Sequence, residues 1–291
     1  MIVRAAALLG LVSAPLAGQG VTPPRPALPD LPASVRSAGL AGIAVPLPGD
    51  AAVVFVNPSS IGPLRRLSVE ASYASLSGDR WYTTGAAALR VGRLSAGGGY
   101  RYLDYTGDGP VAGNLQWVAA VAGRVAPFHL GVSAKYVAVE DSSGEVYRTL
   151  TEDAAVTLAF FDIAAVALSF NNLGRSRLSG ARLDLPASTH LGFSLNLIDT
   201  YSNGRLLATA ETIWTHDAPR RTLIGLEGGV VVSGVGLVAR VGHGGQPQGS
   251  GAGKTAYGGS LVLSRARIDY AFQPRTSVGR SVHLVGLHWT P

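Results

Sequence analysis

The sequence contains no cysteine. This absence excludes disulfide cross-links and a lipid anchor on cysteine, and it fits an exported protein of a bacterial envelope. Long hydrophobic runs are also missing: beyond the N-terminus, the longest strongly apolar run is residues 154–161. A membrane-spanning helix needs roughly 18 such residues, so the sequence predicts no spanning helix.

Clustered positive charge is missing too, although the formal net charge is +6. Lysines and arginines are scattered singly along the chain, whereas nucleic-acid-binding surfaces gather them in one patch or stripe. We therefore expect no nucleic-acid partner. The six histidines show no metal-ligand spacing, and we expect no metal and no cofactor.

The chain is nevertheless 47% hydrophobic, which leaves a large soluble β core or a barrel with an apolar face toward lipid. The N-terminus favours the barrel. Arg4 precedes an apolar run at residues 5–12, and small residues with a proline follow at 14–17. This order is typical of a secretory signal peptide, which we predict at residues 1–20 with cleavage between Ala17 and Gly20. An ordinary buried helix is the alternative.

The main feature present is a pattern of apolar and polar residues that alternates with a period of two. Leu191, Phe193, Leu195 and Leu197 alternate with small or polar residues. Because successive side chains of a strand point to opposite faces, such a segment has one apolar and one polar face. The pattern recurs from about Arg65 to the end of the chain and predicts an all-β, antiparallel transmembrane barrel.

The predicted strands are residues 65–76, 79–91, 93–104, 114–125, 127–140, 146–160, 163–171, 187–197, 204–215, 221–232, 235–243, 254–264, 265–273 and 280–290. Short and long connections alternate between them, as in outer-membrane barrels with short periplasmic turns and longer outer loops. The short first outer loop (77–78) and the long inner turn (198–203) break this rule. Because the last strand also alternates poorly, the count is 12 or 14, with 14 favoured.

Charged side chains fall on the polar faces of these strands. A charge on the lipid face at mid-membrane costs about 2–4 kcal/mol, so we expect the charged faces to point into the lumen. The predicted lumen-facing charged residues are Glu70, Arg90, Arg101, Arg124, Lys135, Glu211, Glu227, Arg240, Arg267 and Asp269. These side chains either pair with one another and fill the barrel, or line a path and hold a plug.

The region before the strands, residues 21–64, is predicted to form a proline-rich periplasmic tail followed by a compact plug. Residues 21–32 are rich in proline, which disfavours helix and sheet. Residues 33–63 combine small residues with an Asn-Pro turn signal. The expected plug residues are Gly39, Gly42, Asp50, Asn57 and Pro58. The barrel itself is assigned to residues 65–291.

Residues 39–44, 50–52 and 57–62 resemble the opening of FadL-type and PorV-type outer-membrane barrels. Residues 268–274, with Gly279 and His283, resemble the penultimate hairpin of that family. The resemblance implies 14 strands, a plugged lumen, and hydrophobic ligands that bind near the plug and leave sideways through the wall. PorV-like members instead bind exported proteins in type IX secretion. This chain has Ser59-Ser60 where the family has Ala-Gly, and its short outer loops place it nearer the PorV-like branch.

The sequence thus favours a non-enzymatic protein of the bacterial outer membrane that lets small hydrophobic compounds, such as fatty acids, pass through a plugged barrel. Gly97, Gly98 and Gly99 are the candidate lateral opening, because glycines weaken strand pairing. A PorV-like platform for type IX secretion or surface assembly is the alternative, and a purely structural barrel is a third. Ser281 and His283 lie two apart on one strand without an orienting group, so no catalytic residue is predicted.

Overall fold

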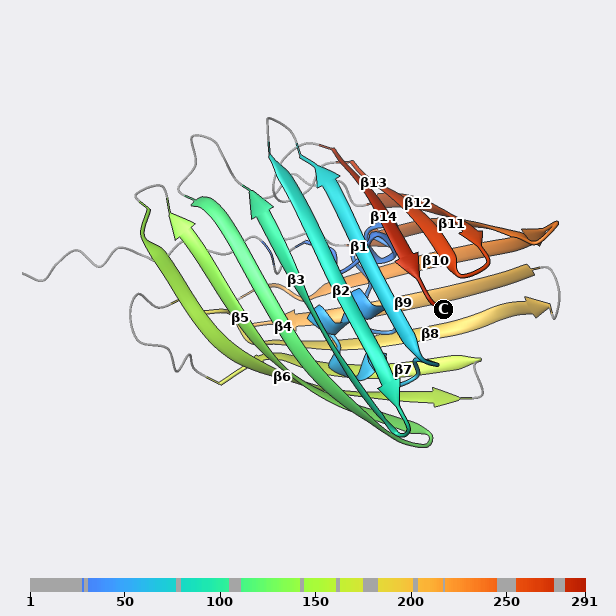
Figure 1. Cartoon of the computed structure of the whole chain (residues 1–291), viewed down its shortest axis with the longest axis horizontal. Helices are drawn as coiled ribbons and strands as arrows, with labels where there is room; N and C mark the ends of the chain where they lie inside the picture. Colours follow the sequence, from blue (N-terminus) through green and yellow to red (C-terminus); the bar gives the residue numbers. More distant parts are fainter. Residues whose placement is uncertain are drawn as a thin grey trace, which may run out of the picture.

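The computed structural model describes residues 28, 31–76, 80–104, 111–141, 144–160, 163–174, 183–200, 204–216, 218–244, 255–274 and 281–291. The predicted signal peptide therefore lies outside the described residues. Fourteen antiparallel strands form one closed barrel in which each strand pairs with its neighbours in sequence and β1 pairs with β14 (Figure 1). In the part of the chain that is described, no helix is long and apolar enough to cross a membrane.

The strands are β1 (Leu67–Ser75), β2 (Trp81–Val91), β3 (Leu94–Asp104), β4 (Val111–Val125), β5 (Phe128–Asp141), β6 (Val146–Phe160), β7 (Ala164–Leu173), β8 (Ser188–Thr200), β9 (Gly204–Thr215), β10 (Arg221–Val232), β11 (Val235–Gly244), β12 (Thr255–Leu263), β13 (Ala266–Gln273) and β14 (Val282–Trp289). All fourteen predicted strands are present, which decides the count between 12 and 14. The largest differences are at β4, which begins at 111 rather than 114, and β8, which ends at 200 rather than 197.

The outer surface of the barrel is apolar. Every strand carries at least one large hydrophobic side chain that is exposed, among them Val121, Leu130 and Leu287, each more than half exposed. Alternate positions point inward and are buried, as in β5, where His129 and Lys135 face the lumen. An apolar outer band over a polar interior is the arrangement that a lipid-embedded barrel requires.

Strand β14 shows why its alternation was weak in the sequence. Its burial alternates strictly, with Val282, Leu284 and His288 inward and His283 outward. The inward Val282 and Leu284 are apolar because they pack against Leu28 and other residues of the N-terminal region. Since both faces of the strand therefore carry apolar side chains, hydropathy alone could not separate them.

The two ends of the barrel differ. At one end, here called the turn end, two-residue turns connect β2 to β3, β4 to β5, β10 to β11 and β12 to β13. The opposite end is called the loop end. The connection predicted at 198–203 lies at the turn end and is shorter than expected, because β8 continues to Thr200. A register irregularity between Asn196 and Ile198 accommodates this extension.

The N-terminal region lies inside the barrel, where Figure 1 shows its short helices in blue. We call residues 31–64 the plug; it contains α1 (Val35–Gly39) and the 3₁₀ helices η2 (Ala51–Phe55) and η3 (Pro58–Ile61). The plug touches the wall closely where strands present glycine. A Cβ added at Gly242 would overlap the carbonyl carbon of Leu40. The backbones of plug and wall are therefore in direct contact.

Candidate functional site in the barrel lumen

Six buried or half-buried charged side chains form a closed ring of ion pairs between the plug and β10–β13, which we call the ionic ring: Arg36, Asp50, Glu227, Arg240, Arg267 and Asp269. Two of these side chains belong to the plug. The Nε and Nη2 of Arg36 donate to the two carboxylate oxygens of Glu227 at 2.7 and 2.8 Å. Its Nη1 donates to Asp50 at 3.1 Å, and Asp50 in turn pairs with Arg267 at 3.3 Å.

The wall completes the ring. Arg240 lies between two carboxylates, 2.6 Å from Glu227 and 3.2 Å from Asp269. Arg267 Nε donates to Asp269 at 2.7 Å. Three arginines and three carboxylates thus balance in charge, and each member has an opposite charge on two sides. Buried charges are tolerated when they are paired and hydrogen-bonded in this way.

Asp50 is the plug's acidic contact, and it does not lie in a membrane-spanning strand. Burial favours its neutral form, but Arg267 and Arg36 outweigh burial and hold the pKa of Asp50 well below its usual range. Asp50 is therefore an anion at neutral pH. His288 Nδ1 also lies 3.7 Å from Asp50, and its Nε2 is 2.8 Å from the Ser68 hydroxyl.

A second anchor lies on β9, on the far side of the plug from β1. Glu211 is buried, and one of its oxygens accepts backbone N–H groups of Ala44 and Val45 at 2.8 and 3.0 Å. Its other oxygen lies 2.8 Å from His190 Nδ1. Glu211 therefore satisfies two plug amides that would otherwise be buried without partners.

The Asn-Pro turn is the third anchor. Asn57 Oδ1 accepts the Ser59 N–H at 3.0 Å and so caps η3, while its Nδ2 donates to the Val45 carbonyl at 2.8 Å. Ser59 places its hydroxyl 2.8 Å from Thr157 on β6. The turn thus also contacts the wall through the Ser59 hydroxyl.

Replacing Asn57 and Pro58 together by alanine should raise single-channel conductance in planar bilayers. The change removes the cap of η3 and the side-chain bond to Val45, which loosens the plug. Replacing the outward-facing Ser75 by alanine is the control and should leave conductance as it is. Equal conductance of the Asn57/Pro58 variant and the wild type would count against this role for the turn.

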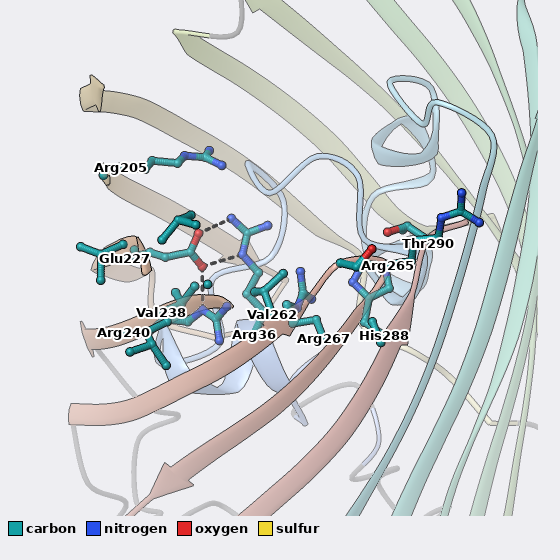
Figure 2. A pocket seen from close by; sticks show the side chains of 18 of the residues that line it. Arg36, Arg205, Glu227, Val238, Arg240, Val262, Arg265, Arg267, His288 and Thr290 are labelled. Carbon is teal, nitrogen blue, oxygen red and sulfur yellow. Dashed lines mark hydrogen bonds and ion pairs between the residues drawn. The ribbon is translucent and has the colours of Figure 1, made fainter. Parts of the chain in front are cut away.

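A cavity of about 430 Å³ lies at the turn end, beside the ionic ring. Figure 2 shows Glu227 joined to Arg36 and Arg240 at its wall, with Arg205, Arg265 and Thr290 around it. Most of its charged lining residues are arginines, and the plug forms part of its boundary. The cavity at the turn end therefore has a mixed lining of valines, glycines and arginines, and it ends at the ionic ring.

The loop end of the lumen has the opposite character. Its inward-facing residues are largely apolar, and we call them the apolar collar: Leu76, Tyr82, Leu103, Val137, Val139, Tyr147, Ile213, Leu223, Val282 and Leu284. They pack against Leu28 and Leu31, against plug residues, and against Leu183 from the β7–β8 connection. The lumen thus changes from apolar at the loop end to charged at the turn end.

The structure places the other predicted site residues as follows. Of the predicted charged residues, Lys135 pairs with Asp153 at 2.9 Å, Arg90 donates to the Leu64 carbonyl, and Arg124 is exposed at the turn end. Glu70 accepts the Ala52 N–H at 3.3 Å.

In the plug, a Cβ on Gly39 would lie 3.0 Å from Gly258, and Gly42 has a positive φ of 100°.

The wall is continuously paired at Gly97, Gly98 and Gly99. These residues lie opposite 86–88 on β2 and 118–120 on β4 without interruption.

Sequence reasoning missed Arg36, His190 and His288, which all contact the anchors described above. The sequence did offer one signal for Arg36. It is a charged residue within a stretch of small and apolar residues that was predicted to be buried.

No family model matches the sequence, and no curated protein matches it. Solved structures do match. The CymD monoaromatic hydrocarbon channel aligns with a TM-score of 0.65 and 11% identity, over 90% of this chain and 98% of its own. The toluene transporter TbuX of Ralstonia pickettii gives 0.61 and 9% over 88% and 97%. A FadL homologue of Pseudomonas aeruginosa gives 0.56 and 12% over 88% and 98%.

The fold is that of the FadL-type outer-membrane channels. Identities of 9–12% carry the likeness of fold alone. The expected resemblance is confirmed at this level, and the neighbours are channels and transporters by their descriptions. Fold does not imply function, so the activity has to be argued from the lumen.

Proposed function

We propose that this protein is a bacterial outer-membrane channel for the passive passage of small hydrophobic compounds, such as fatty acids. The observation that carries the proposal is the apolar collar at the loop end. A water-filled pore has a polar interior, whereas apolar side chains facing the lumen offer a favourable surface to a compound that is poorly soluble in water, once Leu28 and Leu31, which pack against part of the collar, move aside. We assign the loop end to the outside and the turn end to the periplasm.

The ionic ring gives a reason for a sideways exit. A hydrophobic compound that moved straight down the lumen would have to displace the plug and separate buried ion pairs, which is costly. Leaving the collar through the wall into the bilayer avoids this cost. The seam between β2 and β3, next to Gly97, Gly98 and Gly99, is the proposed exit, and its complete pairing means that it has to part during passage.

A reversible disulfide across that seam should block uptake. Leu89 and Ala96 are directly opposed on β2 and β3, and the natural chain has no cysteine to interfere. Oxidation of a Leu89→Cys/Ala96→Cys variant should abolish uptake, and reduction should restore it. The matched pair Ala119→Cys/Ala134→Cys joins β4 to β5 and should have no effect. Unchanged uptake after complete oxidation at the first pair would exclude this seam as the exit.

Uptake by whole cells tests the function itself. A bacterial strain without its own channel for the compound should take up a labelled fatty acid or toluene faster when it carries this barrel. Toluene is included because two structural neighbours are described as toluene transporters. Uptake of a sugar should stay the same. Equal uptake of every hydrophobic compound with and without the barrel would contradict the proposal.

A protein-interaction platform for type IX secretion or surface assembly is the second candidate. Two of the loop-end connections, β5–β6 and β9–β10, span only four and five residues between strands, which leaves little structure at those two places to capture a dilute ligand. A stoichiometric exported protein on the purified barrel would favour this candidate.

A further inference from the structure

The turn end of the barrel carries a group of arginines with no acidic neighbour. They are scattered singly in the sequence, but strand pairing brings them to the tips of six adjacent strands, from β13 through β14 and β1 to β4. We call this group the arginine crown: Arg65, Arg66, Arg90, Arg93, Arg124 and Arg265. Among the described residues at these tips (65–68, 88–96, 121–130, 263–267 and 287–291) there is no aspartate or glutamate.

Strand pairing sets two pairs of these arginines side by side. The Arg90 N–H donates to the Arg66 carbonyl at 2.7 Å, and the Arg124 N–H donates to the Arg93 carbonyl at 2.9 Å. Like charges that oppose each other across two strands are destabilising. The Arg90 side chain donates to two backbone carbonyls, and no side-chain hydrogen bond or ion pair joins the other crown members to any described residue. An anion from outside the chain relieves this repulsion.

The other arginines of the lumen are matched within the chain. Those of the ionic ring all contact carboxylates. Arg101 of β3 is buried and donates to the Leu28 and Leu31 carbonyls at 3.2 and 3.4 Å. Arg205, which is exposed at the turn end of β9, is directly opposed to Asp199 on β8. The crown therefore differs from these arginines in joining positive charge, exposure to solvent and the absence of a counter-charge.

The crown surrounds the mouth of the lumen rather than facing lipid. Arg66, Arg90 and Arg124 each lie two positions from a buried, inward-facing residue of the same strand, and side chains two apart in a strand point to the same face. Arg93 is opposed to Arg124 on the same row. Arg265 lines the cavity beside the ionic ring (Figure 2). With the turn end assigned to the periplasm, these guanidinium groups meet the periplasmic solution.

The crown is too wide for a single small anion. Neighbouring strands lie about 4.8 Å apart, so the tips of six adjacent strands span about 25 Å. A phosphate or a lone carboxylate contacts one or two arginines, at N–O distances of about 2.7–2.9 Å. An extended peptide rises about 3.3 Å per residue, so a segment of about eight residues covers the same span. The dimensions therefore fit a chain that carries several negative charges.

We infer that the arginine crown is a docking site for an acidic segment of a periplasmic protein. Carboxylates of the segment pair with the exposed guanidinium groups, which favour this geometry, and they neutralise the two like-charge pairs. This inference goes beyond the proposed channel function. It uses the assignment of the turn end to the periplasm, and it holds whether or not the barrel passes hydrophobic compounds.

A fluorescent peptide of alternating glutamate and serine, about eight residues long, is the probe for this site. Its binding to the full-length barrel in nanodiscs of neutral phosphatidylcholine is measured by fluorescence anisotropy. Arg93→Gln/Arg124→Gln should weaken binding by about fivefold or more, because two charged contacts are lost. The matched control Arg148→Gln/Arg220→Gln removes the same charge from exposed arginines at the loop end and should leave binding unchanged. The same peptide with glutamine in place of glutamate should not bind.

Four results would overturn the inference. Equal weakening in the two double variants would show that net charge, rather than the crown, holds the peptide. Displacement of the peptide by inorganic phosphate at constant ionic strength would show separate small-anion sites. Phosphatidylglycerol that stays on the wild type but not on Arg93→Gln/Arg124→Gln after detergent extraction, without peptide binding, would assign the crown to lipid headgroups. A marked fall in the unfolding temperature of that variant would show a role in the fold, whereas removal of a like-charge pair should leave or raise it.

Discussion

Replacing Asp50 by asparagine should release the plug from the ionic ring and raise the single-channel conductance of the barrel. The substitution leaves Arg36 and Arg267 buried against a neutral amide. Removing one partner of a buried ion pair typically costs about 3–5 kcal/mol, and we expect the lower end of that range here because Arg36 keeps Glu227 and Arg267 keeps Asp269. That loss is a large fraction of the roughly 5–15 kcal/mol by which most domains are stable, so we expect the plug to leave its position more often than in the wild type.

Asp199→Asn is the matched control, because Asp199 is an exposed aspartate of β8 near the same cavity. It should leave conductance unchanged. The double variant Asp50→Asn/Arg36→Gln should cost less than the sum of the two single changes, since the residues are in contact and share one network. Wild-type conductance in the Asp50→Asn variant would show that the ionic ring does not hold the plug.

Replacing Gly242 by valine should displace the plug by steric overlap rather than by loss of charge. The new Cβ would overlap the Leu40 carbonyl carbon and would lie 2.5 Å from the Ala41 nitrogen. Both are backbone atoms, so no side-chain rotation can relieve the contact, and we expect a cost at or above the roughly 1–3 kcal/mol usual for overpacking. Protease cleavage within residues 31–64 should increase in the folded barrel.

Gly228→Val provides the comparison on the opposite face of the wall. A Cβ at Gly228 meets only the Leu206 side chain, at 3.8 Å, so this variant should resist protease like the wild type. Identical cleavage of the Gly242→Val and Gly228→Val barrels would mean that the plug does not need the close backbone contact at β11.

The strands could be predicted because the two sides of this wall meet different surroundings. Where lipid lies on one side of a strand and polar groups lie on the other, as in β5, hydropathy alternates along the strand. The side of the wall to which each side chain points can then be predicted from the sequence. The plug interferes with this signal: at Val282 and Leu284 it presents apolar groups to the lumen, and the alternation of β14 weakens. The 14-strand count therefore depended on the neighbouring strands as much as on β14 itself.

The pairing of the lumen charges could not be read from the sequence in the same way. The inward direction of Glu227 and Arg240 follows from alternation, but Arg36 meets Glu227 across 191 residues of sequence. That contact depends on closure of the barrel and on how the plug enters it.

Mass spectrometry of what co-purifies with the barrel from native membranes in mild detergent tests the central claim most directly. A channel for hydrophobic compounds should carry a stoichiometric apolar small molecule. A stoichiometric exported protein or secretion component, with no apolar small molecule, would contradict the account and support the platform.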